Sequence, residues 1–116
     1  VACQAAYEEG EPWLTELKKY LLENLDFSRD YIERNLPGVH LIKPEGTYLI
    51  WLDFRDLRLP EEELEHLITK EAKLWLDSGA IFGSDGEGFE RINIACPRTT
   101  LKEAFDRLAK ALNSLE

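Results

Sequence analysis

The spacing of apolar residues predicts a long amphipathic helix in the N-terminal third of the chain. Residues 2–9 are rich in alanine and read as the last turns of an earlier helix, which stops at Gly10. Beyond Gly10, charged residues separate apolar side chains that recur at helical spacing, and residues 36–38 (Leu-Pro-Gly) end the pattern. The predicted buried stripe comprises Leu14, Leu17, Leu21, Leu25 and, more loosely, Ile32.

Three segments have the pattern of β-strands. Residues 39–43 form a short candidate strand, and a Pro-Glu-Gly turn at 44–46 connects it to residues 47–54. The second segment (TYLIWLDF) is rich in β-branched and aromatic residues at both parities, which predicts a strand covered on both faces. Residues 91–96 (RINIAC) alternate with a period of two. The turn between the first two strands is short enough for an antiparallel hairpin.

Two further helices are predicted in the C-terminal half. One begins after Pro60 with three glutamates in its first turn, which suit the positive end of the helix dipole. Its predicted buried stripe is Leu64, Leu67, Ile68 and Trp75. The other begins with a capping box of Thr100 and Glu103. Its predicted buried side chains are Leu101, Ala104, Phe105, Leu108, Leu112 and Leu115.

The order of elements predicts an α+β domain. A small, mostly antiparallel sheet is expected to carry its helices on one face. A length of 116 residues allows one compact domain, so residues 1–116 are expected to form a single domain. The chain starts at Val1 and contains no methionine, which leads us to expect that an upstream part is missing.

Composition excludes several classes of function. The chain has 14 basic and 23 acidic residues and a net charge of −9, which argues against a nucleic-acid surface. Two distant cysteines and two histidines lack the spacing of a metal site, so no metal is expected. No apolar run is long enough to span a membrane and no signal peptide opens the chain, so we expect a cytoplasmic protein without a membrane partner.

One glycine-rich loop and two arginines are the candidates for chemistry. The loop at residues 79–88 (GAIFGSDGEG) superficially suggests a phosphate cradle, but it lacks the Lys-Ser/Thr of a P-loop and is followed by a strand. A tight connection with positive φ angles is the simpler interpretation. Arg91 points away from the apolar side of its strand and could bind a carboxylate bidentately, or it could pair with one of the many acids. Judged by spacing alone, Arg98, which follows the same strand, is an equally good candidate for binding a carboxylate.

A family resemblance separates these alternatives. Residues 79–98 (GAIFGSDGEGFERINIACPR) closely resemble the C-terminal signature of class I/II aminotransferase-like enzymes, with most similarity to the bacterial cystathionine β-lyase-like branch. Residues 6–7 with 10–14 (GEPWL), and residues 44–55 (PEGTYLIWLDFR), agree in order and spacing. The glycine loop is followed by a specific pattern of Phe89, Arg91, Asn93, Ala95, Pro97 and Arg98.

The resemblance implies the C-terminal small domain of a fold-type-I enzyme that depends on pyridoxal phosphate. Residues 1–9 then end an interdomain helix, and the small domain closes over a cofactor held by a large domain absent from this chain. Arg91 is implied to bind the α-carboxylate of an amino-acid substrate, whereas Arg98 looks structural. Tyr48 is implied to lie near the mouth of the cleft, a core position being the alternative. The parent enzyme is expected to be a homodimer.

No catalytic or cofactor-binding residue is expected within the chain. None of its lysines lies in a context like the Schiff-base segment of the family: Lys18, Lys19, Lys43, Lys70, Lys73, Lys102 and Lys110. In the parent, the cofactor would act as an electron sink, and the outcome would be transamination or β-elimination of a sulfur leaving group. The GEPWL segment and the ending at residues 95–98 favour the lyase. The alternative is a free-standing acidic interaction module that keeps the fold without catalysis.

Overall fold

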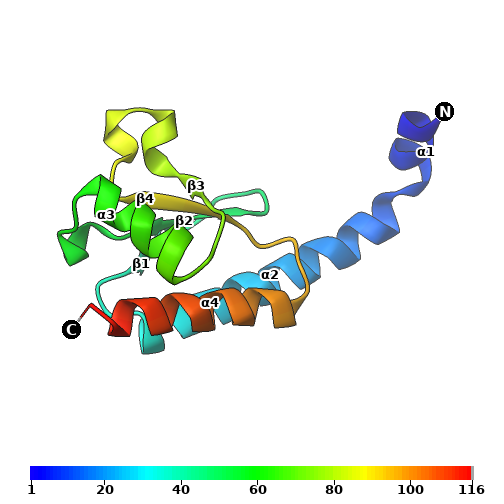
Figure 1. The fold of residues 1–116 in the computed structure, drawn as a ribbon. Coiled ribbons are helices and arrows are strands. Elements are labelled where there is room, and N and C mark those ends of the chain that lie inside the picture. Colours follow the sequence, from blue (N-terminus) through cyan, green and yellow to red (C-terminus); the bar gives the residue numbers. More distant parts are fainter. Residues whose placement is uncertain (116) are drawn as a thin grey trace.

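The computed structural model describes residues 1–115 and shows an α+β arrangement (Figure 1). Two helices come first, followed by a sheet that is interrupted by short helical segments, and a last helix closes the chain. The helices and strands are α1 (Ala2–Glu9), α2 (Glu11–Asn35), β1 (His40–Leu41), β2 (Leu49–Asp53), α3 (Glu61–His66), β3 (Asp77–Ser78), β4 (Phe89–Asn93) and α4 (Arg98–Asn113). The single-turn segments are η1 (Arg55–Leu57), η2 (Leu67–Glu71), η3 (Gly79–Phe82) and η4 (Ser84–Gly86).

The sheet has the strand order β1-β2-β4-β3, and every neighbouring pair is antiparallel. The predicted hairpin of the first two strands is confirmed, although both strands are shorter than predicted. Strand β4 begins two residues earlier than the alternation indicated, because its pairing with β2 extends to Phe89 opposite Asp53. Strand β3 was not predicted, since two residues are too few for a detectable period.

The helices cover one face of the sheet, as predicted. Helices α2 and α4 run side by side beneath the sheet (Figure 1). Inward-facing Ile50, Leu52 and Ile92 of the central strands are buried against the helical side chains. On the opposite face Leu49 and Trp51 are only half-buried, so the prediction that β2 is covered on both faces was wrong. That uncovered face carries Arg91.

Three details of the predicted helices differ from the structure. Trp75 was expected in a buried stripe but is 94% exposed, because α3 ends at His66 and the chain leaves the helix through the wide η2 turn. The predicted capping box was wrong: α4 already begins at Arg98, after Pro97, and no side chain caps it. Leu115 lies past the end of α4 and is exposed, as is Leu14 in the part of α2 that extends away from the sheet (Figure 1).

A buried asparagine connects α2 to the end of β4. The Asn24 side chain is fully buried, and its Nδ2 donates to the carbonyl oxygens of Ile94 at 2.8 Å and Cys96 at 3.0 Å. Its Oδ1 accepts from Nε of Arg98 at 2.6 Å. A buried polar group is stable only when it is hydrogen-bonded, and here each polar atom has a partner. This network fixes the direction in which the chain leaves the central strand.

Candidate functional site

Arg91 lies in the middle of a row of side chains across the uncovered face of the sheet. Its direct partner on β2 is Trp51, and its direct partner on β3 is Asp77. Directly opposed residues in antiparallel strands point to the same face of a sheet, so these three side chains are neighbours. The sheet therefore presents an indole, a guanidinium and a carboxylate in sequence across three strands.

Two contacts hold the guanidinium of Arg91 in place. Oδ2 of Asp77 accepts hydrogen bonds from Nε at 3.1 Å and from Nη2 at 2.8 Å. Cζ of Arg91 lies 4.6 Å from the centre of the Phe82 ring, a cation–π distance. The same ring meets Trp51 edge-on at 5.4 Å between centres. Arg91 therefore pairs with an acid, as one of the two interpretations of the sequence expected. Asp77 uses only some of the N–H donors of the guanidinium.

A shallow depression adjoins Arg91 on this face. It has a volume of about 290 Å³ and is lined by Leu49, Trp51 and Arg91 together with residues 42–47 of the β1–β2 connection. The half-exposed indole and leucine form an apolar floor beside the charged group. Such a combination suits a small molecule that has both a carboxylate and a hydrocarbon part.

Tyr48 is outside the set of residues that line this depression. Its side chain is 48% exposed, and its backbone carbonyl accepts from the N–H of Ile94 at 2.9 Å. The exposure disagrees with a core position. The role of Tyr48 at the mouth of a cleft stays a prediction.

Arg98 is held by the body of the domain. Besides its bond to Asn24, its guanidinium lies 5.2 Å from the ring centre of Phe27, and its backbone N–H donates to the hydroxyl of Tyr20 at 2.8 Å. These contacts join the start of α4 to α2. They support the structural role that the resemblance implied for this arginine.

Several backbone N–H groups of the glycine-rich loop donate hydrogen bonds within the domain. The N–H groups of Gly83, Gly86 and Glu87 donate to carbonyls three residues earlier, and the N–H of Gly88 donates to Glu61 Oε2 at 2.8 Å. Gly83 and Gly88 have φ of 127° and 79°, as the interpretation of a tight connection requires. These four N–H groups are therefore unavailable to a phosphate.

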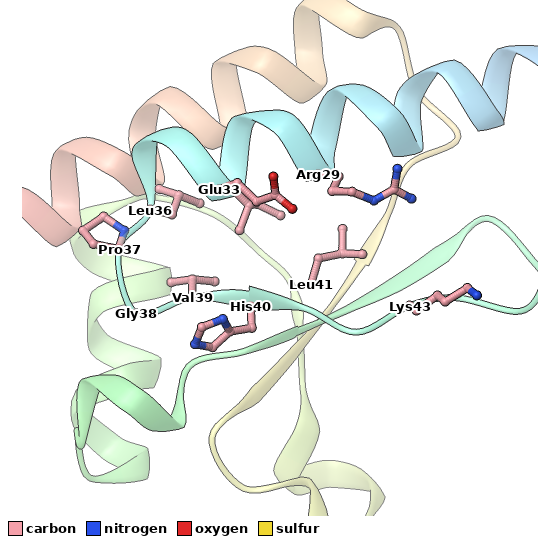
Figure 2. Close-up of a pocket in the computed structure, with 10 residues that line it drawn as sticks. Arg29, Glu33, Leu36, Pro37, Gly38, Val39, His40, Leu41 and Lys43 are labelled. Atoms are coloured by element: carbon pink, nitrogen blue, oxygen red, sulfur yellow. The ribbon is translucent and has the colours of Figure 1, made fainter.

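A larger groove of about 680 Å³ lies between α2 and β1 (Figure 2). Arg29 and Glu33 project from α2 toward the segment that carries Leu41 (Figure 2). Two of its basic groups have acidic partners: Arg29 pairs with Asp26 at 2.8 Å, and His40 with Asp56 at 2.7 Å. Lys43 is the third basic residue of the lining and Glu33 adds a negative charge to the wall, so the groove is mixed in charge rather than selective for an anion.

A buried carboxyl group lies directly beneath the uncovered face. The side chain of Glu90, next to Arg91, points to the helical side of the sheet and is 1% exposed. Burial and a hydrogen bond to the Glu65 side chain raise the pKa of Glu90 to about 9, and the negative charges of Glu61 and Asp77 act in the same direction. The Oε1 atoms of Glu90 and Glu65 are buried and have no hydrogen-bond partner among the described residues. At neutral pH Glu90 is therefore protonated.

Residues 1–115 contain neither a cluster of metal-ligating side chains nor a membrane-spanning helix. Within this range no three His, Cys, Asp or Glu side chains are grouped so that they could hold a metal ion. No described helix combines the length and the apolar character needed to cross a membrane.

Comparison with known proteins shows extensive similarity to one group of enzymes. No family model matches the chain. Cystathionine beta-lyase PatB of Bacillus subtilis is 39% identical over 112 residues, which are 97% of this chain and 29% of PatB. Protein MalY of Escherichia coli is 34% identical, over 96% of this chain and 28% of MalY. The crystal structure of cystalysin from Treponema denticola, which contains pyridoxal 5'-phosphate, superposes with a TM-score of 0.94 at 39% identity, over 99% of this chain and 29% of cystalysin.

The fold and these relatives define the class of protein. Over nearly its whole length the chain is similar to one part of pyridoxal-phosphate-dependent aminotransferases and C–S lyases, and it has the fold of the small domain of fold-type-I enzymes. Within this class it is similar to bacterial cystathionine β-lyases, while aminotransferases, such as an aromatic-amino-acid aminotransferase of Thermococcus litoralis, are also among its relatives. The chain spans 29% of the length of PatB and of the Corynebacterium glutamicum cystathionine beta-lyase, and 20% of the Thermococcus litoralis aminotransferase.

Proposed function

We propose that this chain is the C-terminal, substrate-binding domain of a pyridoxal-phosphate-dependent enzyme that cleaves C–S bonds of amino acids, and that Arg91 binds the substrate α-carboxylate. The observation that carries the proposal is the geometry of Arg91. It lies on the uncovered face of the sheet beside an apolar depression, and its side chain is 27% exposed. An arginine held in this way has donors available for a second carboxylate.

The cofactor does not fit the described residues alone. Four N–H groups of the glycine-rich loop are used by hydrogen bonds within the domain, and the depression beside Arg91 is a shallow surface feature. Lys43 at its edge is exposed on a connection rather than enclosed. The large domain, absent from this chain, would therefore hold the cofactor. The contribution of this domain is to orient the amino acid and, on closure, to exclude water from it.

Helix α1 supports the proposed relation to a larger enzyme. None of its residues is buried, and it stands away from the sheet at the end of α2 (Figure 1). Nearby Tyr7 and Trp13 are 88% and 69% exposed. Aromatic side chains exposed to this degree are typical of a surface that packs against another part of a protein. We assign residues 1–9 to the end of an interdomain helix and regard the parent as a cytoplasmic homodimer.

The choice of lyase over aminotransferase rests on the relatives. Both PatB and a Corynebacterium glutamicum relative carry the name cystathionine beta-lyase, at 39% and 38% identity. Both reactions require the α-carboxylate of the amino acid to be bound, so the geometry of Arg91 is compatible with either reaction. A free-standing interaction module is the remaining alternative, and the similarity of the chain to part of enzymes that bind the cofactor argues against it.

The test uses the full-length protein that contains this chain. Incubation with L-cystathionine should release pyruvate, and replacement of Arg91 by alanine should lower kcat/KM by roughly 30- to 5,000-fold, the effect of removing one partner of a buried charge pair. Arg98→Ala is the matched control and should act mainly on stability. Rapid amino-group exchange between alanine and a 2-oxo acid, without pyruvate from any sulfur substrate, would reassign the enzyme as an aminotransferase.

A further inference from the structure

The hydrogen bonds of Arg91 divide its guanidinium into an occupied and a free edge. Arginine has five N–H donors, and one carboxylate oxygen of Asp77 takes the donors at Nε and one at Nη2. The two donors at Nη1 and the second at Nη2 remain. Of these, the second N–H of Nη2 and one N–H of Nη1 point along the end edge of the guanidinium plane, where a carboxylate can accept two parallel bonds.

The remaining contacts fix the plane of the group as well as its edge. The Phe82 ring lies 4.6 Å from Cζ of Arg91, and Trp51 braces that ring edge-on. Asp77 is the cross-strand partner of Arg91, so the pairing of β3 with β4 sets the distance between the carboxylate and the guanidinium. With an acid on one edge and an aromatic ring on one face, the guanidinium has little rotational freedom left.

We infer that Asp77 is a positioning residue for substrate binding: it holds one edge of the Arg91 guanidinium so that the end edge faces the α-carboxylate of the amino acid. This inference rests on the proposed function of Arg91. Asp77 touches no substrate atom and acts through the arginine. Its loss frees a flexible side chain, and binding of a carboxylate must then restrict that side chain anew, which weakens affinity.

The structure also limits how Asp77 can act. Its side chain is 47% exposed on an edge strand, so its truncation leaves no cavity in the core. Asparagine at this position keeps an oxygen that can accept from the same two donors and loses only the charge. Serine is too short to reach the guanidinium. The three substitutions to alanine, serine and asparagine therefore separate loss of the hydrogen bonds from loss of the charge.

The test uses the full-length holoenzyme and two competitive inhibitors, L-alanine and ethylamine, which differ only in the carboxylate. Asp77→Ala and Asp77→Ser should raise the inhibition constant of L-alanine about tenfold, the effect of one lost charge-assisted hydrogen-bond constraint. Ethylamine should be unaffected by either change. Asp77→Asn should retain affinity for L-alanine within about threefold. In an Arg91→Ala background, Asp77→Ala should have no further effect on L-alanine.

Each contrary result has a distinct meaning. If Asp77→Ala leaves L-alanine binding unchanged or strengthens it, Asp77 does not position Arg91, and the inference is overturned while the role of Arg91 stands. Equal weakening of L-alanine and ethylamine would identify a general structural effect and would also overturn it. If Arg91→Ala itself leaves the inhibition constant of L-alanine unchanged, the proposed carboxylate site fails, and the inference about Asp77 fails with it.

Discussion

Replacement of Glu90 by glutamine should remove most of the pH dependence of stability of this domain. Glu90 is almost completely buried on the helical side of β4, opposite Leu52 of β2. The ionisable groups that act on it are all acidic: Glu65 and Glu61 from α3, and Asp77 from β3. No cation offsets a charge on Glu90 among these neighbours. Glutamine keeps the size of the protonated side chain and cannot ionise.

The sign of the effect follows from the two states of the chain. The pKa of Glu90 is about 9 in the folded domain and near 4.5 in the unfolded chain, so between these values the folded state binds one more proton. The free energy of unfolding therefore decreases as pH rises, by up to about 1.4 kcal/mol per pH unit. The contribution is complete below about pH 4.5 and lost above about pH 9. Between pH 6 and pH 8 the loss is on the order of 3 kcal/mol.

The measurement is urea unfolding of the 116-residue chain at a series of pH values between 5 and 9. The unchanged chain should lose stability steadily as pH rises, whereas Glu90→Gln should give a nearly flat profile and be more stable than the unchanged chain at pH 8. Glu87→Gln, at an exposed position of the adjacent loop, is the matched control and should leave the slope as it is. An unchanged slope in Glu90→Gln would refute the reasoning.

Four further outcomes are expected. Gly79→Ala should destabilise the chain by about 1–3 kcal/mol, because a Cβ there would lie 2.0 Å and 2.8 Å from two backbone oxygens, whereas Gly46→Ala, with nothing within 4 Å, should be neutral in the same urea titration. Asn24→Ala should cost at least about 2 kcal/mol, since it leaves buried carbonyls unpaired; an unfolding midpoint equal to that of the unchanged chain would contradict this. Burial and the Asp106 carboxylate raise the pKa of Tyr31 to about 12, so Tyr31→Phe should remove the tyrosine that ionises last in an ultraviolet titration. The chain alone should bind no pyridoxal phosphate after desalting, and a retained stoichiometric absorption band that borohydride quenches would show otherwise.

Several features could be predicted from local sequence because local physical chemistry decides them. The helical spacing of leucines and the Leu-Pro-Gly sequence at residues 36–38 predicted where α2 lies and where it ends. The alternation of Ile92 with Ile94 predicted the inward face of the central strand. Alternation alone also placed Arg91 on the opposite face. The role of Arg91 as a carboxylate ligand came from the resemblance, and it remains a proposal.

Which side chains are buried, and which hydrogen-bond partners they have, depended on contacts between segments far apart in the sequence. Trp75 has the spacing of a buried residue but is exposed, because the helix ends before it and packing against α4 covers the η2 turn instead. The capping box failed for a similar reason: the network of Asn24 anchors Arg98 and lets α4 begin two residues before Thr100.

The partner of Arg91 also depended on the fold. Asp77 lies 14 positions earlier in a strand of two residues, and no local pattern distinguishes it from the other acids of the chain. Only the antiparallel pairing of β3 with β4 brings it to the guanidinium. The placement of α3 on the helical side of the sheet likewise sets Glu90 near Glu61 and Glu65. The sequence by itself determined which segments become helix or strand and which face of the central strand is apolar, since these follow from neighbours along the chain. Tertiary structure decided which charges meet, because an ion pair depends on distances that only the assembled sheet sets.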